Sequence, residues 1–186
     1  MTTGVSTRDI VYIALFAALM AALGLVPPIQ VGFLPVPITA QTLGVMLAGC
    51  LIGAKRGGLA ILLFVVLVAL GLPILAGGHG GLGVFFGPTA GFILSWPIAA
   101  FVTGLLAERN WQRINAVWFF AVSVIGGIGV VYLIGVPWVA AVAKISLTDA
   151  MTGSLVFIPG DILKAVAAAA IAEAVRRSYP LMQATR

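Results

Sequence analysis

Long stretches without charge limit how this chain can fold more than any other feature. Residues 10–54 and 57–107 contain no Asp, Glu, Lys or Arg, and 62% of the 186 residues are hydrophobic. A helix needs roughly 20 apolar residues to cross about 30 Å of hydrocarbon, so each of these stretches has room for two crossings. Residues 114–143 and 150–175 have room for one each. We therefore expect an all-α integral membrane protein with six transmembrane helices.

Proline and glycine mark where these helices end. Pro27 and Pro28 stop the first helix, because proline lacks a backbone N–H and disfavours helical geometry at the residue before it. Residues 71–91 hold eight of the 23 glycines, which predicts a long loop rather than a straight helix. The expected helices span residues 9–26, 39–54, 58–72, 88–107, 115–136 and 153–177.

The positions of Lys and Arg predict the orientation in the membrane. If six helices cross, the side that holds both ends of the chain receives eight basic residues, and the other side receives only Lys144. Cytoplasmic loops carry an excess of Lys and Arg, so both termini should be cytoplasmic. The uncharged loops 27–38 and 73–87 then lie on the outer side, near the start of the sixth helix. The eight basic residues are Arg8, Lys55, Arg56, Arg109, Arg113, Arg176, Arg177 and Arg186.

Composition argues against several other classes. The chain has no segment of mixed composition of about 50 residues, as a separate soluble domain would need, so residues 1–186 should form one membrane-embedded domain. The apolar run after Arg8 lacks an early cleavage site, which favours a retained first helix. The basic residues form no single patch for nucleic acid. With only Cys50 and His79 as soft ligands and no P-loop motif, we expect no metal, no cofactor and no ATP hydrolysis.

Among the charged residues of the last stretch, 150–175, one pair is informative. Asp161 and Lys164 stand three apart in FIPGDILKA and therefore share one face of a helix. A charge at the middle of a membrane helix costs about 2.5–3.5 kcal/mol, so both groups should face the interior and have partners. One interpretation is an ion pair that holds helices together. The other is a ligand or ion site, in which Lys164 and a turn opened at Pro159 and Gly160 contact an anion.

Two weaker signals lie in the first half of the chain. The amide of Gln41 can donate and accept hydrogen bonds, as recognition of an amide or ureido group requires, although an interhelical contact is equally compatible. Ala14, Ala18 and Ala22 recur every four residues in the first helix and give it a smooth face. Such a face suits either an internal helix contact or the docking of a partner.

Three segments carry a resemblance to a known family: PVPITAQTLGVMLAG, GLPILAGGHGGLGVFFGPTAGF and FIPGDILKA. They resemble the BioY biotin transporters, the substrate-binding S components of energy-coupling factor (ECF) uptake systems, and the likeness extends over nearly the whole chain. It implies a six-helix S-component fold in a prokaryotic cell membrane, with an outward-facing pocket closed by the first and third loops. The implied substrate is biotin, and the implied partners are a transmembrane T component and two cytoplasmic ATPases.

The resemblance also implies roles for individual residues. Asp161 and Lys164 match the family's polar pair at the pocket, and Gln41 matches its helix-two glutamine. His79 falls in the glycine-rich loop, where family members place a polar ligand contact. The Ala14-xxx-Ala18 face resembles the helix-one surface on which S components dock the T component.

One part of the expected pocket departs from the family pattern. We expect tyrosine more often where Phe92 stands, and glycine where Ala90 stands. Phe92 has no hydroxyl to donate, but it can still form a wall of the pocket. Biotin combines a ureido ring, an apolar thioether and chain, and one carboxylate. Gln41, Asp161, the apolar loops and Lys164 match these groups in kind, without settling which residue contacts which end.

Two other functions stay open at this point. The chain could be an S component for another small vitamin, or an intramembrane enzyme that uses Asp161 with His79. The second alternative lacks the paired or metal-bound groups that such chemistry normally needs. The sequence also leaves open whether the protein works alone, as a homo-oligomer, or only with an ATPase module.

Overall fold

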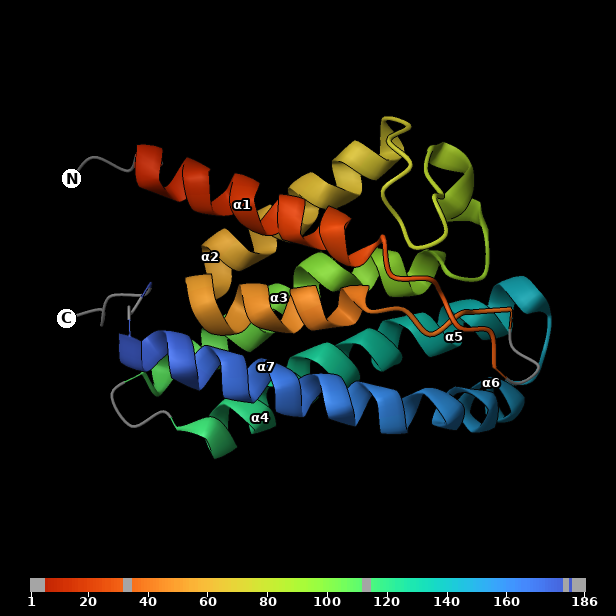
Figure 1. Cartoon of the computed structure of the whole chain (residues 1–186). Helices are drawn as coiled ribbons and strands as arrows, with labels where there is room; N and C mark the ends of the chain where they lie inside the picture. The colour runs from red at the N-terminus through yellow and green to blue at the C-terminus, as the bar shows by residue number, and fades with distance from the viewer. Residues whose placement is uncertain (1–5, 32–34, 112–114, 179–180, 182–186) are drawn as a thin grey trace.

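The chain folds into a bundle of helices that run between the same two ends of the molecule (Figure 1). The computed structural model describes residues 6–31, 35–111, 115–178 and 181. Within these ranges there is no strand, only two isolated β-bridges in loops. The elements in chain order are α1 (Thr7–Leu23), α2 (Gln41–Ala69), η1 (Leu82–Phe86), α3 (Ala90–Arg109), α4 (Ala116–Val124), η2 (Ile125–Val130), α5 (Val131–Ala143), α6 (Leu147–Ser154), η3 (Leu155–Phe157) and α7 (Ile158–Ser178).

Four helical stretches of the described chain are long and apolar enough to cross a membrane. They agree with the expected all-α, multi-pass membrane class, since a crossing needs about 20 apolar residues. The helix α1 has 17 residues, so it is shorter than any of them. The four stretches are Gln41–Ala69, Ala90–Arg109, Ala116–Ala143 and Leu147–Ser178.

The long helix α2 contains a sharp bend at Gly53. Its φ of 83° and ψ of −176° lie in a region that is essentially restricted to glycine, and the helical backbone breaks there. Figure 1 shows the chain reversing direction at this point, so that α2 consists of two arms. The sequence predicted two helices, 39–54 and 58–72, and the bend lies inside the first of these predicted segments, one residue before its predicted end.

Several predicted helix ends were wrong. The helix predicted to stop at residue 136 continues past Pro137 to Ala143, because neighbouring groups can satisfy the backbone that proline frees inside a membrane bundle. The last stretch begins at Leu147 rather than residue 153, where the Ser146 side chain accepts a hydrogen bond from the Asp149 backbone N–H. The helix α1 ends at Leu23, three residues before the predicted end.

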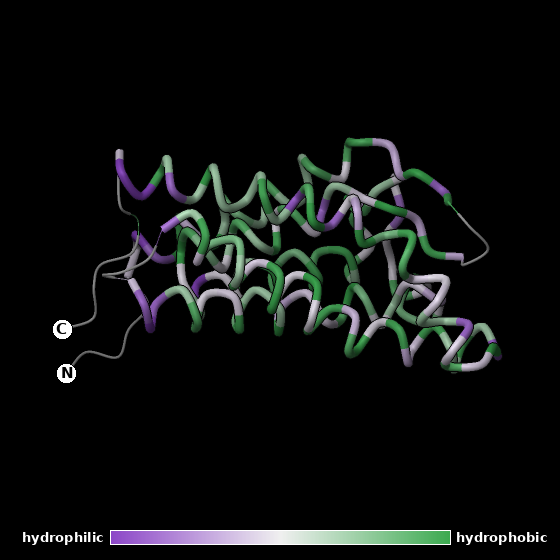
Figure 2. The backbone as a smooth tube through the Cα atoms, turned by 90° about the horizontal axis from the view of Figure 1, so that it is seen from below, coloured by the Kyte–Doolittle hydropathy of each residue, from purple (hydrophilic) through white to green (hydrophobic). Residues whose placement is uncertain are grey.

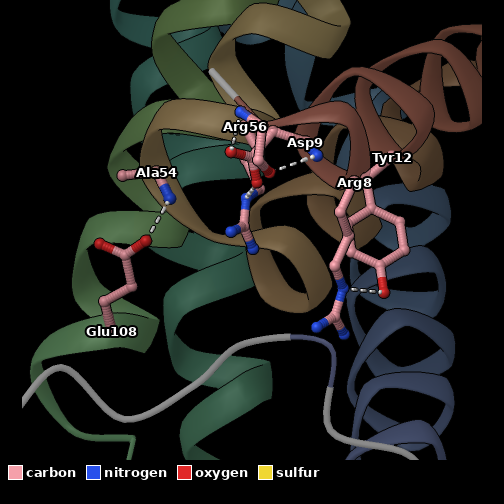
Figure 3. A network of polar contacts seen from close by, with 7 residues as sticks. Arg8, Asp9, Tyr12, Ala54, Arg56 and Glu108 are labelled. Atoms are coloured by element: carbon pink, nitrogen blue, oxygen red, sulfur yellow. Dashed lines mark hydrogen bonds and ion pairs between the residues drawn. The ribbon is translucent and has the colours of Figure 1, made fainter. Parts of the chain in front are cut away.

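Most of the charged residues lie at one end of the bundle. The N-terminal end of α1 and the C-terminal ends of α3 and α7 meet there beside the bend of α2, and Figure 2 shows hydrophilic residues gathered at this end. Asp9 of α1 forms a 2.5 Å ion pair with Arg56, and Glu108 of α3 accepts a 2.8 Å hydrogen bond from the Ala54 N–H (Figure 3). Arg113 and Arg186, predicted for the same side, lie outside the described residues.

The two uncharged loops lie together at the opposite end (Figure 1). In the first loop, Ile29 and Ile38 exchange backbone hydrogen bonds of 2.9 and 2.8 Å, which brings its two sides together. The other uncharged loop, residues 73–87, follows the third predicted helix and is called the second loop below. In it Leu75 pairs with His79, and η1 follows. Parts of both loops therefore have regular hydrogen bonding, and both loops lie at the end of the bundle opposite the charged residues (Figure 1).

Candidate functional site

A cavity of about 320 Å³ opens beneath the two loops. This volume falls at the lower end of the ~300–1,000 Å³ range of small-molecule sites. Its walls come from both loops and from α2, α3, α5 and α7, so segments far apart in the sequence enclose it. The polar side chains that line it are Gln30, Thr39, Gln41, Thr42, His79, Thr89, Tyr132, Asp161 and Lys164.

Asp161 and Lys164 contact each other at the floor of this cavity. Lys164 Nζ lies 2.7 Å from Asp161 Oδ1, and the two side chains are only 15% and 7% exposed. The side chain of Thr42, at the start of α2, joins both: its hydroxyl accepts a 2.8 Å hydrogen bond from Lys164 Nζ and lies 3.4 Å from Asp161 Oδ1. The ion pair predicted from sequence is present, and it borders an open cavity rather than closed helix packing.

Tyr132 of α5 completes this group, and no sequence pattern singled it out as a pocket residue. Its hydroxyl donates a 2.6 Å hydrogen bond to Asp161 Oδ2, the oxygen that does not contact Lys164. The ring of Phe92 meets the ring of Tyr132 edge-on, with centroids 6.1 Å apart and planes at 88°. Tyr132 therefore places a hydroxyl in the pocket, close to the position where we expected tyrosine in place of Phe92.

Apolar side chains form most of the remaining wall. Phe92 is only 8% exposed and lies on α3 one turn before Trp96, which also lines the cavity. Phe157 closes the side next to α7, and Val36 comes from the first loop. The pocket thus combines a polar floor with hydrophobic sides, the usual composition of sites for small, largely apolar ligands. 

Gln41 and His79 also line the cavity, but in different ways. His79 is exposed on the second loop, at the outer rim. Gln41 is 1% exposed, and its amide forms hydrogen bonds with backbone atoms of α1 and of the second loop. The structure brings all five predicted binding residues, Gln41, His79, Phe92, Asp161 and Lys164, to one cavity.

The predicted docking residues lie elsewhere. Ala14, Ala18 and Ala22 are exposed on one face of α1, directed away from the bundle, whereas Ala17 and Met20 on the other face are buried. One interpretation of this face was an internal helix contact. Within the described residues this interpretation is wrong, because Ala14 and Ala18 are exposed. This face is available to lipid or to a partner.

No metal site can be built from the described residues. No three His, Cys, Asp or Glu side chains in this part of the chain lie close enough to share an ion. Cys50 is buried within the bundle, 3.4 Å from the Ser123 hydroxyl and apart from the cavity. The chemistry that the pocket offers is hydrogen bonding, charge and apolar contact.

Comparison with known proteins places the chain in a family. Its sequence matches the BioY family over residues 1–181. It belongs to the BioY family. It is 53% identical over 184 residues to the biotin transporter BioY of Rhizobium etli, a match that covers 96% of this chain and 98% of that protein. It is 47% identical over 182 residues to the biotin transporter BioY of Rhodobacter capsulatus, covering 93% and 95%.

The fold of this BioY family member is also similar to a solved structure. That structure is the 2.1 Å crystal structure of the S-component for biotin from an ECF-type ABC transporter. The two chains superpose with a TM-score of 0.92 over 100% of each, at 32% sequence identity.

Proposed function

We propose that this protein is the biotin-capturing S component of an ECF-type vitamin uptake system, a transport subunit and not an enzyme. The observation that carries the proposal is the full-length likeness, at a TM-score of 0.92, to the S-component for biotin. Relatives at 53% and 47% identity are biotin transporters. The cavity beneath the two loops supplies a site for the vitamin, formed by the single membrane-embedded domain of residues 1–186.

The chemistry of the pocket suits biotin. The ureido ring carries two N–H groups and one carbonyl, so it needs both acceptors and donors. In the floor of the pocket the Asp161 carboxylate and the hydroxyl oxygens of Tyr132 and Thr42 can accept, and Lys164, which uses two of its three N–H groups within the protein, can donate. The thioether ring and aliphatic chain match the apolar wall around Phe92. His79 at the rim is placed to contact the end of the ligand that points toward the loops.

The orientation in the membrane follows from the charges. We assign six crossings to α1, the two arms of α2, α3, the stretch α4 to α5, and α7, with both termini in the cytoplasm. Six described basic residues then lie on the inner side, in agreement with the positive-inside rule: Arg8, Lys55, Arg56, Arg109, Arg176 and Arg177. The pocket opens toward the outside of a prokaryotic cell, where a scarce vitamin is captured.

The remaining subunits supply the energy for import. The likeness to an S-component of an ECF-type ABC transporter supports two cytoplasmic ATPases as the energy source, coupled through a transmembrane T component. We assign the exposed face of Ala14 and Ala18 to the contact with the T component. Small residues there let another helix approach closely within the membrane.

Binding of radiolabelled biotin to the purified protein tests this function. We expect saturable binding near the nanomolar range, corresponding to about −12 kcal/mol. Excess unlabelled biotin should displace the label, and the same excess of thiamine or riboflavin should not. Absence of saturable binding, or displacement by thiamine or riboflavin at similar concentrations, would favour an S component for another vitamin.

A further inference from the structure

Gln41 is located where three parts of the chain meet. It is the first residue of α2, it is 1% exposed, and it lies between the end of α1 and the second loop. A buried amide must satisfy its hydrogen-bonding groups inside the protein, because water does not reach it. The partners of this amide therefore indicate what the residue does.

The amide of Gln41 bonds only with backbone groups. Nε2 donates to the carbonyl oxygens of Met20 in α1 and Ile74 in the second loop, each at 3.1 Å. Oε1 accepts from the Ala76 N–H, also at 3.1 Å. A glutamine side chain has two N–H groups, and here each has a protein partner. Gln41 thus has no amide N–H left for a ligand.

Gly24, which ends α1, gives a second and independent sign of a close junction at this point. A Cβ atom at this position would lie 2.4 Å from the Ile74 carbonyl oxygen and 3.1 Å from Gln41 Nε2. No real Cβ atom approaches a backbone oxygen so closely. The end of α1 and the second loop can therefore meet in this way only if residue 24 lacks a side chain.

We propose that Gln41 is a positioning residue that fastens the second loop to α1, rather than a group that recognises the ligand through its own amide. The fastened segment includes Leu75 and Ala76, each 6% exposed and each lining the cavity. Releasing it would open one side of the pocket. Because Met20 belongs to α1, this one side chain links α1, the start of α2 and the second loop.

The opening of the loop can be measured without any ligand. Ala76→Cys, in a Cys50→Ala background, places a thiol at the fastened segment. It keeps the backbone N–H of residue 76, which donates a hydrogen bond to Gln41 Oε1. Labelling by a water-soluble maleimide then reports how often the segment opens, because a buried thiol reacts only in the open state. We expect Gln41→Leu to raise the labelling rate by about tenfold or more, since the segment loses its two hydrogen bonds to this side chain and the side chain loses its third, to Met20 of α1.

Two further variants separate fastening from general destabilisation. Gly24→Ala keeps the Gln41 side chain but crowds the Ile74 carbonyl and the amide that binds it, so it should also raise the labelling rate. Asn115→Leu removes another side-chain amide, which accepts a 2.9 Å hydrogen bond from the Trp118 N–H at the opposite end of the bundle. It should leave labelling at residue 76 unchanged. If Gln41→Leu does not yield folded protein, Gln41→Glu, which keeps the acceptor and loses both donors, replaces it.

The result that overturns the proposal is a labelling rate at residue 76 that stays at the wild-type value in the folded Gln41 variant and in Gly24→Ala.

The consequence for ligand release rests on the proposed function: we expect faster dissociation of biotin from Gln41→Leu with little change in its association rate. A slower association rate with unchanged labelling would make Gln41 a direct ligand contact. If the wild-type protein binds no biotin, the proposed function fails, while the labelling still decides whether Gln41 fastens the loop.

Discussion

Tyr132 and Lys164 divide the two oxygens of Asp161 between them: the phenol donates to Oδ2 at 2.6 Å, and the ammonium contacts Oδ1 at 2.7 Å. Asp161 as a whole is 5% exposed, so both contacts are largely shielded from water. This arrangement fixes the plane of the carboxylate at the floor of the pocket. A ligand that enters meets an acceptor whose orientation is already set.

Tyr132→Phe tests the role of the phenol. The variant removes one hydrogen bond to a buried charged group, which typically contributes about 1.5–3 kcal/mol. We expect the melting temperature of the ligand-free protein to fall and the affinity for biotin to drop by about tenfold. Equilibrium binding and thermal unfolding in detergent measure the two effects. Phe92→Tyr provides a comparison, because it adds a hydroxyl at the neighbouring ring. An affinity equal to wild type in Tyr132→Phe would remove Tyr132 from the site.

Ala18→Leu tests the exposed face of α1. The larger side chain should prevent a partner helix from approaching closely, while the pocket on the other side of the bundle is untouched. We expect normal binding of biotin by the isolated subunit, together with loss of co-purification with the T component and ATPases. Ala170→Leu makes the same change at an exposed alanine of α7 and serves as the control. Assembly that persists in Ala18→Leu, or fails equally in Ala170→Leu, would show that partners dock elsewhere.

The bend of α2 depends on Glu108, which accepts the Ala54 N–H at 2.8 Å. Glu108→Ala leaves this N–H without its partner, a loss of about 1–3 kcal/mol for a buried donor. Glu108→Gln keeps an oxygen that can accept, so it should be much closer to wild type. We expect thermal unfolding to order the three proteins as wild type, Glu108→Gln and Glu108→Ala. Equal melting temperatures for the two variants would mean that the charge, and not the hydrogen bond, supports the bend.

Much of the architecture could be predicted from the sequence, because charges and prolines are strong signals in an apolar chain. The cluster at Lys55 and Arg56 indicated where α2 turns, and the bend at Gly53 lies two residues before it. The pair of Asp161 and Lys164 was predicted to face the interior with partners, since unpaired charges in hydrocarbon are costly. The predicted helix end at residue 136 was wrong, since the effect of a proline such as Pro137 on a helix depends on neighbours that the sequence does not place.

The site was predicted only in part for a related reason. Tyr132 lies near the end of a predicted helix, where aromatic residues usually anchor to the membrane interface, and only the fold brings it to Asp161. Gln41 was predicted to lie at the pocket, but its partners are backbone atoms of residues 20, 74 and 76. Every residue has a backbone carbonyl, so the residue types do not indicate which backbone group a side chain will bind. Contacts of this kind are therefore found only in the structure.

The ion pair at the floor of the pocket allows the two interpretations of Asp161 and Lys164 to be separated. Removing one partner of a buried pair leaves an uncompensated charge and costs about 3–5 kcal/mol. Asp161→Asn and Lys164→Met should therefore each destabilise the protein. Replacing both residues removes both charges, so the double variant should recover much of the lost stability. A purely structural pair predicts that the double variant also binds biotin normally.

The most direct test is the affinity of the double variant Asp161→Asn, Lys164→Met for biotin, measured by titration calorimetry on protein whose ligand-free melting temperature is close to that of wild type. We predict one biotin per wild-type chain and a loss of affinity of about hundredfold or more in the double variant, equivalent to about 2.7 kcal/mol. A stable double variant with wild-type affinity would contradict the assignment of this pair to the biotin site.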